Sequence, residues 1–247
     1  MFDIVIPSRS RAYNQKTIHN LSEELWEKIT VVVPHTQYTE YKRTLPSDIT
    51  TIPFEEVDSA GEKRDFILNM KETGKIFLLD DDLTFYCRTL DGKKFPQATK
   101  AETKSMMYEI SRYLDTYAMV GVTDKFMSQT KPREHMECQR CNQVLCINRD
   151  LLPKPWPKFE MAVGEEHHFH LQLLTQGYKT TVLTEWSKSD KTDAPGGCSE
   201  WRNAQNIGET FRKLEGLWPG IITINWSTSP ARFRCNWQEA KRRGGIC

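Results

Sequence analysis

Three adjacent carboxylates, Asp80, Asp81 and Asp82, directly follow the apolar run 76–79. Carboxylates this close repel one another, so a compensating positive charge is expected beside them. Oxygen ligands suit a hard divalent cation such as Mg2+ or Mn2+, which also binds diphosphates. Because side chains alternate along a strand, Asp80 and Asp82 would share a metal while Asp81 reaches a nucleotide. An acidic turn is the simpler interpretation, and the position after a buried strand favours the metal site.

A further pair of carboxylates, Glu165 and Glu166, begins the helix that periodicity predicts for residues 164–176. Glu166 would share its face with the apolar Phe169 and Leu173 and with His170, and would therefore point inward. Glu165 would lie about 100° away around the helix. A carboxylate directed into a site can act as general base toward a hydroxyl acceptor. A purely structural amphipathic helix is the alternative.

Histidines and cysteines also raise the question of a zinc site. His167 and His170 are neighbours on the same helix, but no third compatible ligand lies nearby in the sequence. The pattern H-x2-C-x2-C-x4-C at residues 135–146 lacks a second, separated C-x2-C pair, and Cys146 lies in an apolar run. Free thiols are therefore the favoured interpretation of the seven cysteines.

Basic residues occur where a diphosphate would need them. Ser8, Arg9 and Arg11 follow the first apolar run, and Gly61-Glu62-Lys63-Arg64 opens the third predicted helix. A helix N-terminus with an arginine nearby is a good anion site. Solvent-exposed surface arginines are the alternative.

The elements that must position these residues alternate between strand and helix patterns. Apolar runs predict strands at 2–7, 30–34, 49–53 and 75–80, and helices between them at 16–28, 37–44 and 59–71. The second half predicts helices at 103–117, 164–176 and 201–214, and strands at 118–122, 144–148 and 180–184. This alternation indicates βαβ units and an α/β fold with a mainly parallel sheet. Ligands of such sheets gather at the carboxyl ends of the strands, where the acidic triplet lies.

The composition indicates a folded protein without a membrane-spanning segment. The chain has 247 residues, of which 38% are hydrophobic, and it contains no apolar run long enough to cross a membrane. Its first residues lack the features of a signal peptide, so a cytoplasmic protein is expected. Net charge is only +1, but residues 187–247 contain 10 Lys and Arg against 6 Asp and Glu, together with several aromatic residues. Such a mixture suits phosphates and bases.

Four motifs together resemble GT-A-type glycosyltransferases, and the resemblance covers roughly residues 2–186. They are IVIPSR at 4–9, G-x-x-R at 61–64, LLDDD at 78–82 and G-E-E-x-x-F-x-L-x-L-L-x-x-G-Y at 164–178. The segments 196–199 and 232–237 resemble a narrower group, the phage enzymes that glycosylate hydroxymethylated pyrimidines in DNA, which are related to the base J glucosyltransferases. The resemblance implies one GT-A-like, Rossmann-type domain over residues 1–247, with a nucleotide-binding half at 1–100 and an acceptor half at 101–247.

The resemblance also implies roles for individual residues. Mn2+ or Mg2+ would be bound by Asp80 and Asp82, with Asp81 near the ribose. A pocket for a UDP-sugar would be lined by Pro7, Ser8, Arg9 and Arg64. Glu166 stands where such enzymes carry the base of an inverting transfer. Many relatives supply a third metal ligand after the last strand, often His, but no histidine follows His170 here, so Asp190, Asp193 or water would take that place.

For the acceptor, the resemblance implies DNA carrying hydroxymethylated pyrimidines, bound by Arg232, Arg234 and Trp237. A terminal helix with a solvated basic face is the alternative for this segment. Other functions stay open: a glycosyltransferase acting on a saccharide or small molecule, a nucleotidyltransferase, or a non-catalytic nucleic-acid-binding domain on the same fold. Intact Asp80, Asp82 and Glu166 favour an enzyme.

Overall fold

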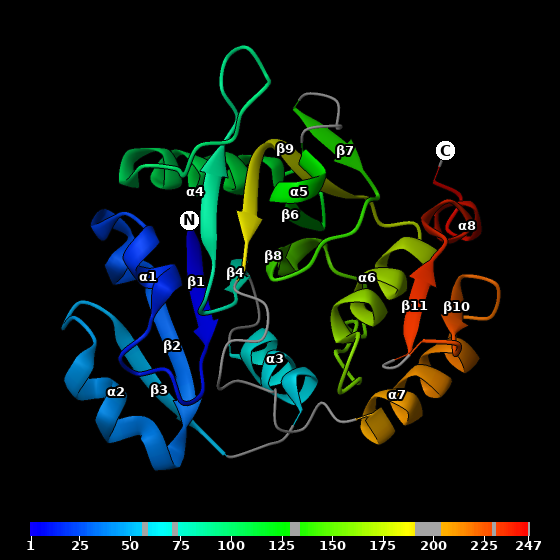
Figure 1. Cartoon of the computed structure of the whole chain (residues 1–247), viewed down its shortest axis with the longest axis horizontal. Coiled ribbons are helices and arrows are strands. Elements are labelled where there is room, and N and C mark those ends of the chain that lie inside the picture. The colour runs from blue at the N-terminus through cyan, green and yellow to red at the C-terminus, as the bar shows by residue number, and fades with distance from the viewer. Residues whose placement is uncertain (56–58, 71–73, 129–133, 191–203, 229–230, 247) are drawn as a thin grey trace.

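The computed structural model of the protein describes residues 1–55, 59–70, 74–128, 134–190, 204–228 and 231–246. In this part of the chain nine strands form one sheet, in the order β3-β2-β1-β4-β8-β6-β9-β5 with β7 paired to β9. Figure 1 shows the sheet crossing the molecule beside its helices. The strands are β1 (Phe2–Pro7), β2 (Ile29–Pro34), β3 (Thr50–Phe54), β4 (Lys75–Leu79), β5 (Thr84–Cys87), β6 (Met119–Asp124), β7 (His135–Glu137), β8 (Val144–Asn148) and β9 (Thr180–Ser189).

Strand direction confirms the predicted mainly parallel sheet. β3, β2, β1 and β4 pair in parallel, and β6 pairs in parallel with β9. β8 is inserted antiparallel between β4 and β6, while β5 and β7 run antiparallel to β9. The carboxyl ends of the parallel strands therefore lie at one edge, which is where the end of β4 places Asp80.

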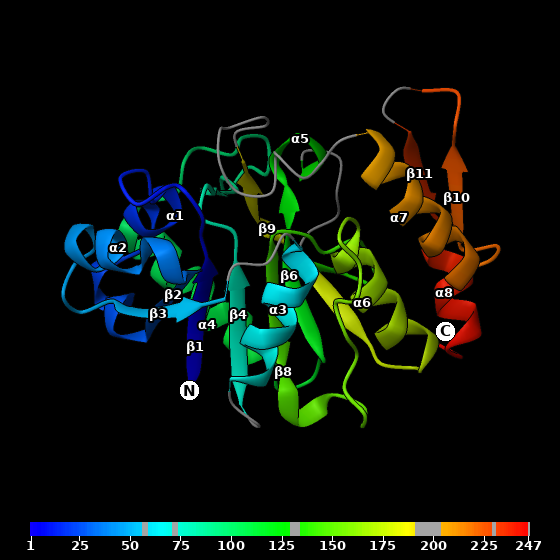
Figure 2. The same cartoon turned by 90° about the horizontal axis from the view of Figure 1, so that it is seen from below.

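Helices cover both faces of the sheet (Figure 2). They are α1 (Lys16–Asn20), α2 (Tyr38–Thr44), α3 (Ala60–Asn69), α4 (Lys100–Tyr113), α5 (Lys125–Ser128), α6 (Glu165–Thr175), α7 (Ala204–Leu217) and α8 (Trp237–Arg243). Ile4 and Ile6 of β1 pack with α4 through Met106, whereas Val5 packs on the other face with α3 and α6. This alternation explains the continuous apolar runs, because strands covered on both faces have no solvent side. None of the described helices has both the length and the apolar character needed to cross a membrane.

A third apolar cluster joins the C-terminal segments to α6. The hairpin of β10 (Ile222–Asn225) and β11 (Arg232–Cys235) packs with α7 and α8 against Leu171 and Leu174. In Figure 1 these elements lie together at one end of the molecule, with α6 between them and the sheet. Helix α6 is therefore enclosed on most of its circumference, which accounts for eight buried residues among its eleven.

The predicted strands are confirmed, with shifts of one residue at some ends and extensions of β6 and β9 beyond their predicted ends. The single helix predicted at 16–28 is wrong: α1 ends at Asn20, and a 3-10 helix follows at Glu23–Lys28. Leu21 has an extended backbone there and is fully buried, so core packing overrides the continuous helical pattern. Strands β5, β7, β10 and β11 were not predicted, because each has only three or four residues; β5 and β7 also pair antiparallel with the distant β9.

Gly61 allows α3 to approach the segment before α6. A Cβ at this position would lie 1.9 Å from the carbonyl oxygen of Phe159 and 2.5 Å from that of Met161. Gly61→Ala must therefore move α3, and we expect the melting temperature to fall by about 3–10 °C. Gly216→Ala in α7 is the matched control, since the added Cβ meets no described atom within 4 Å. Equal melting temperatures for both variants would contradict this account.

Candidate active site

The backbone of the acidic triplet is held from two sides at the end of β4. Thr17 donates its side-chain hydroxyl to the carbonyl oxygen of Asp80, and its N–H donates to that of Asp81 at 3.0 Å. The N–H of Asp80 donates to the carbonyl oxygen of Gln143 at 3.0 Å. The strand ends at Leu79, so the strict side-chain alternation expected for the triplet does not continue through it. The peptide groups of the triplet are thus fixed before any ligand binds.

Asp81 and Asp82 both turn toward the loop after β1. Ser8 donates its hydroxyl to one carboxylate oxygen of Asp81, and Arg11 donates to the other. The same Arg11 guanidinium lies 3.0 Å from Asp82. Ser8 is buried and also hydrogen-bonds to the hydroxyl of Tyr41 at 2.8 Å. The loop after β1, which was predicted to bind an anion, therefore contacts two of the three aspartates through Ser8 and Arg11.

Asp80 turns instead toward Arg64 in α3. The guanidinium of Arg64 donates to Asp80 at 2.8 Å, lies 3.0 Å from Glu166 and is paired with Glu165. Arg64 is itself buried; burial lowers its pKa, but the three carboxylates outweigh that effect and raise it. This arginine joins the end of β4 to the N-terminus of α6, two segments that are far apart in the sequence.

Both glutamates at the start of α6 face the interior. Glu165 has a side chain only 5% exposed, and Glu166 is 14% exposed. Glu166 lies on the face predicted for it, with the buried Phe169 and Leu173. Glu165, about 100° further around the helix, also faces the interior, because α6 is packed on more than one face. Glu166 is the more accessible of the two carboxylates and accepts a hydrogen bond from the N–H of Gln143 at 2.7 Å.

Negative charge at the triplet is only partly compensated. Burial raises the pKa of Asp82 to about 6, the charge of Asp80 adds to this effect, and Arg11 opposes it. Burial also raises the pKa values of Asp80 and Asp81, against the opposing effects of Arg64, Ser8 and Arg11. A divalent cation would supply the missing positive charge.

Residues 2–197 match the TET-associated glycosyltransferase family. The chain belongs to this family. The match takes in the acidic triplet, the Arg64 helix and both glutamates of α6, so the site described above lies within the part that defines the family. The expected GT-A-type glycosyltransferase is thereby confirmed. No protein of curated function matches the sequence.

Solved structures place the glycosyltransferase among GT-A folds. Glucosyl-3-phosphoglycerate synthase from Mycobacterium tuberculosis, solved with Mn2+, UDP and phosphoglyceric acid, superimposes with a TM-score of 0.56 at 9% identity, over 96% of this chain and 86% of the synthase. S. aureus TarS 1-349 in complex with UDP superimposes with a TM-score of 0.51 at 14% identity, over 85% of this chain. The chain spans 63% of that TarS structure, which is less than two thirds of its length.

The other predicted site residues of the glycosyltransferase lie around this centre or beyond it. Pro7 ends β1 and is half-buried, as is Arg9 in the loop that follows. Asp190 follows β9, is exposed, and accepts a hydrogen bond from the side chain of Gln143 at 2.8 Å. Its charge contributes to the raised pKa of Asp82, which places it near the triplet. Asp193 and the segment 196–199 lie outside the described residues.

Among the described residues no three His, Cys, Asp or Glu side chains are grouped around a common ion position. Asp80 is held by Arg64 and Asp82 by Arg11, so these carboxylates are arranged by arginines. Two carboxylates nevertheless fit Mg2+ or Mn2+, because these ions take one or two carboxylates together with substrate phosphates and water. The raised pKa of Asp82 supports the same fit.

His167 and His170 of α6 pack against the aromatic ring of Trp237. His167 stacks on Trp237, with ring centroids 5.6 Å apart, and makes an edge contact with Phe233. His170 contacts Trp237 at 4.9 Å and hydrogen-bonds through Nε2 to Thr180 at 2.7 Å. Burial lowers the pKa values of His167 and His170 to about 3. Both rings are therefore neutral near pH 7.

The described cysteines at 87, 138, 141, 146 and 235 are free thiols, as expected. Gln143 and Lys188 are among the residues of the site that were not found from the sequence. Gln143 lies in the connection to β8, where nothing in the sequence distinguishes it. Lys188 lies in β9 beyond the predicted end of that strand at residue 184, and its 1% exposure is seen only in the structure.

Proposed function

We propose that this glycosyltransferase transfers a sugar from a UDP-sugar to a hydroxyl acceptor, with Mn2+ or Mg2+ as cofactor and the 5-hydroxymethyl group of a modified pyrimidine in DNA as acceptor. The observation that carries the proposal is the network in which Arg64 connects Asp80 to Glu165 and Glu166. It brings a candidate metal ligand, Asp80, and a candidate base, Glu166, to one place. Residues 1–100 would hold the nucleotide, and residues 101–247 would hold the acceptor.

Donor binding follows from the charges at the end of β4. Asp80 and Asp82 would hold the cation, with Asp190 as the nearby candidate for a third ligand. When bound, the cation stabilises negative charge that develops on the departing diphosphate. Pro7, Ser8, Arg9 and Arg64 would line the nucleotide pocket, with Asp81 near the ribose, and Ser8 and Arg11 would keep Asp81 in place.

Proton transfer is assigned to Glu166. Arg64 and the N–H of Gln143 both contact its carboxylate, and its partial exposure leaves it accessible to an acceptor. Glu166 would accept the proton of the acceptor hydroxyl. The hydroxyl oxygen would then bond to the anomeric carbon as the bond from that carbon to the phosphate oxygen breaks and UDP departs. A single displacement of this kind inverts the anomeric configuration.

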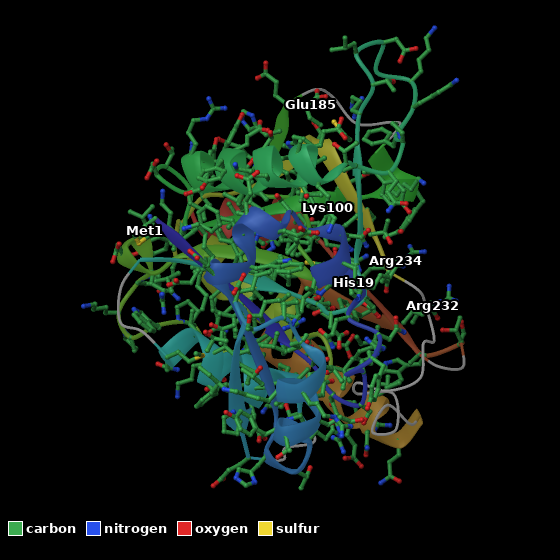
Figure 3. The ribbon with its side chains drawn as sticks, turned by 90° about the vertical axis from the view of Figure 1, so that its left-hand side faces the viewer. Met1, His19, Lys100, Glu185, Arg232 and Arg234 are labelled. Atoms are coloured by element: carbon green, nitrogen blue, oxygen red, sulfur yellow. The ribbon has the colours of Figure 1, made fainter. Side chains whose placement is uncertain are left out.

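The acceptor would contact the outward face of the C-terminal hairpin. Register pairs Thr223 with Arg234 and Asn225 with Arg232, and all four of these residues are exposed. Figure 3 shows Arg232 and Arg234 close together at one side of the molecule. Trp237 packs against the histidines of α6 instead of lying on this face. An exposed aromatic is present at Trp226, 45% exposed, with the Arg212 guanidinium 5.1 Å from its ring centre.

The deciding experiment offers several UDP-sugars, with and without Mn2+, together with hydroxymethylated DNA, unmodified DNA and free saccharides. We expect a mass increase of one sugar residue on nucleosides from hydroxymethylated DNA alone, and only with metal. Transfer to saccharides but not to this DNA would leave a glycosyltransferase with another acceptor. DNA binding without transfer to any acceptor would identify a non-catalytic binding protein.

If the outward face of the hairpin binds DNA, its arginines should determine part of the salt dependence of DNA affinity. Arg232→Ala/Arg234→Ala should weaken DNA binding and reduce the slope of log affinity against log salt by up to ~1.8, about 0.9 for each phosphate that is no longer neutralised. The matched control is Arg242→Ala/Arg243→Ala, which removes the same charge from α8. Those two arginines pair with Glu239 at 2.7 and 2.9 Å, so a smaller change is expected. Equal slopes for the two double variants would count against the hairpin as the DNA-binding surface.

A further inference from the structure

Gln143 has a backbone conformation that is unusual for its residue type. It lies immediately before β8 with φ of 61°, in the left-handed region that non-glycine residues rarely adopt. Such a conformation persists only where the surroundings enforce it. The surroundings of Gln143 are the carboxylates of the candidate active site.

The peptide groups of Gln143 bridge the two halves of that site. Its N–H donates to Glu166 at 2.7 Å, and its carbonyl oxygen accepts from the N–H of Asp80 at 3.0 Å. A single residue therefore connects the candidate base with the backbone of a candidate metal ligand. Arg64 makes a second connection between the same two residues, through their side chains.

The side chain of Gln143 is held at both ends. Its amide oxygen accepts a hydrogen bond from Lys188, and its amide nitrogen donates to Asp190 at 2.8 Å. Lys188 is almost completely buried and also donates to Asp124. The amide is thus fixed between a buried cation on β9 and an exposed carboxylate at the end of the same strand.

We propose that Gln143 is a positioning residue: Lys188 and Asp190 hold its side chain, and its peptide N–H thereby fixes the orientation of the Glu166 carboxylate. This inference rests on the proposed function, since it takes Glu166 to be the base in sugar transfer. Without the side-chain contacts, the backbone of residue 143 is free to leave the left-handed conformation. Its N–H then no longer holds Glu166 in one orientation, and the base loses alignment with the acceptor hydroxyl.

The test compares wild type, Gln143→Gly, Gln143→Asn and the control Gln176→Gly, an exposed glutamine at the other end of α6. Glycine accepts the left-handed backbone without strain but also adopts many other conformations, so this variant removes the side-chain contacts without adding strain. We expect kcat of Gln143→Gly to fall ~10–100-fold, because small misplacements of a reacting group have effects of this size. UDP affinity in Mn2+ should stay within ~3-fold of wild type. Gln143→Asn should recover part of kcat, and the control should match wild type.

Hydrogen exchange at the residue 143 amide gives a readout that does not depend on turnover. Relative to its unfolded rate, this amide should exchange at least ~10-fold faster in Gln143→Gly than in wild type. Lys188→Met should add little further loss of kcat in the Gln143→Gly background, since both changes remove the same hydrogen bond between Lys188 and the Gln143 side chain.

Unchanged exchange at residue 143, or unchanged kcat in Gln143→Gly, would overturn the positioning role. A parallel fall of kcat, UDP affinity and melting temperature would also overturn it, as this pattern indicates general loss of structure. Absence of transfer by wild type to every acceptor would overturn the proposed function instead, and amide exchange would still decide whether Gln143 is clamped.

Discussion

Glu166→Gln is expected to lower turnover ~10²–10⁴-fold while UDP binding in Mn2+ persists. Glutamine has nearly the same shape and can still accept hydrogen bonds from Arg64 and from the N–H of Gln143, which hold Glu166 in wild type. It cannot accept the proton of the acceptor hydroxyl. Steady-state transfer kinetics and calorimetric titration with UDP would measure the two quantities on the same preparation.

Glu165→Gln is the matched control, because it makes the same chemical change one residue earlier. Glu165 is almost fully buried and paired with Arg64, so its loss leaves Arg64 with less compensation and should mainly lower the melting temperature. Turnover of the folded variant should remain far above that of Glu166→Gln. If Glu165→Gln is the variant that loses turnover while Glu166→Gln retains it, the assignment of the base is wrong.

Asp82→Asn is expected to have opposite effects on stability and on donor binding. Loss of a candidate metal ligand should weaken Mn2+-dependent UDP binding by about 100-fold or more, since even outer-shell partners of a metal are worth 10–100-fold. The same change removes a negative charge from a crowded cluster and should stabilise the metal-free protein. Calorimetric titration measures the first effect, and thermal unfolding in chelator measures the second.

The sign of the stability effect follows from the pKa of Asp82, which is about 6 in the folded protein against an ordinary value of 3.8. Above pH 6 the carboxylate is ionised in both states, and the folded state is disfavoured by up to about 3 kcal/mol. This penalty disappears as pH falls through 6 toward 4, because the folded state takes up the proton first. Metal-free wild type should therefore gain stability from this group between pH 7 and 5, and Asp82→Asn should lack that gain.

A lower melting temperature of metal-free Asp82→Asn at pH 7, or unchanged Mn2+-dependent UDP affinity, would contradict this interpretation. Asp150→Asn is a suitable control, since Asp150 is an exposed aspartate whose hydrogen bond at 3.2 Å is made to Gly74, at the opposite end of β4 from the triplet. It should change neither quantity appreciably.

The donor side of the site was predictable because its signals are local. An apolar strand followed by three aspartates, and an arginine one turn into a helix that begins near Gly61, are visible within a few residues of sequence. The orientation of Glu165 was not predictable, because α6 is buried on several faces and a single apolar stripe does not describe it. The role of Trp237 shows the same limit, since its contacts with His167 and His170 join segments about 70 residues apart.

Gln143 was missed for a different physical reason. Its hydrogen bonds reach Asp80, Glu166 and Lys188, which are 63, 23 and 45 positions away in the sequence. Its left-handed backbone is one that sequence patterns assign to glycine or asparagine. Only the antiparallel insertion of β8 beside β4 brings residue 143 to the acidic triplet, and strand order is not contained in local periodicity.

The two faces of the C-terminal hairpin are under different packing constraints. On β10 buried and exposed positions alternate, and on β11 Phe233 lies among the rings beside α6 while Arg232 and Arg234 lie outside. Inward positions must keep their shape, because they pack against the helix that carries Glu166. Outward positions touch neither that helix nor the acidic triplet through any described interaction. Under the proposed function, the outward side chains can therefore be substituted to change the preferred acceptor without disturbing the packing around α6 or the residues next to β4.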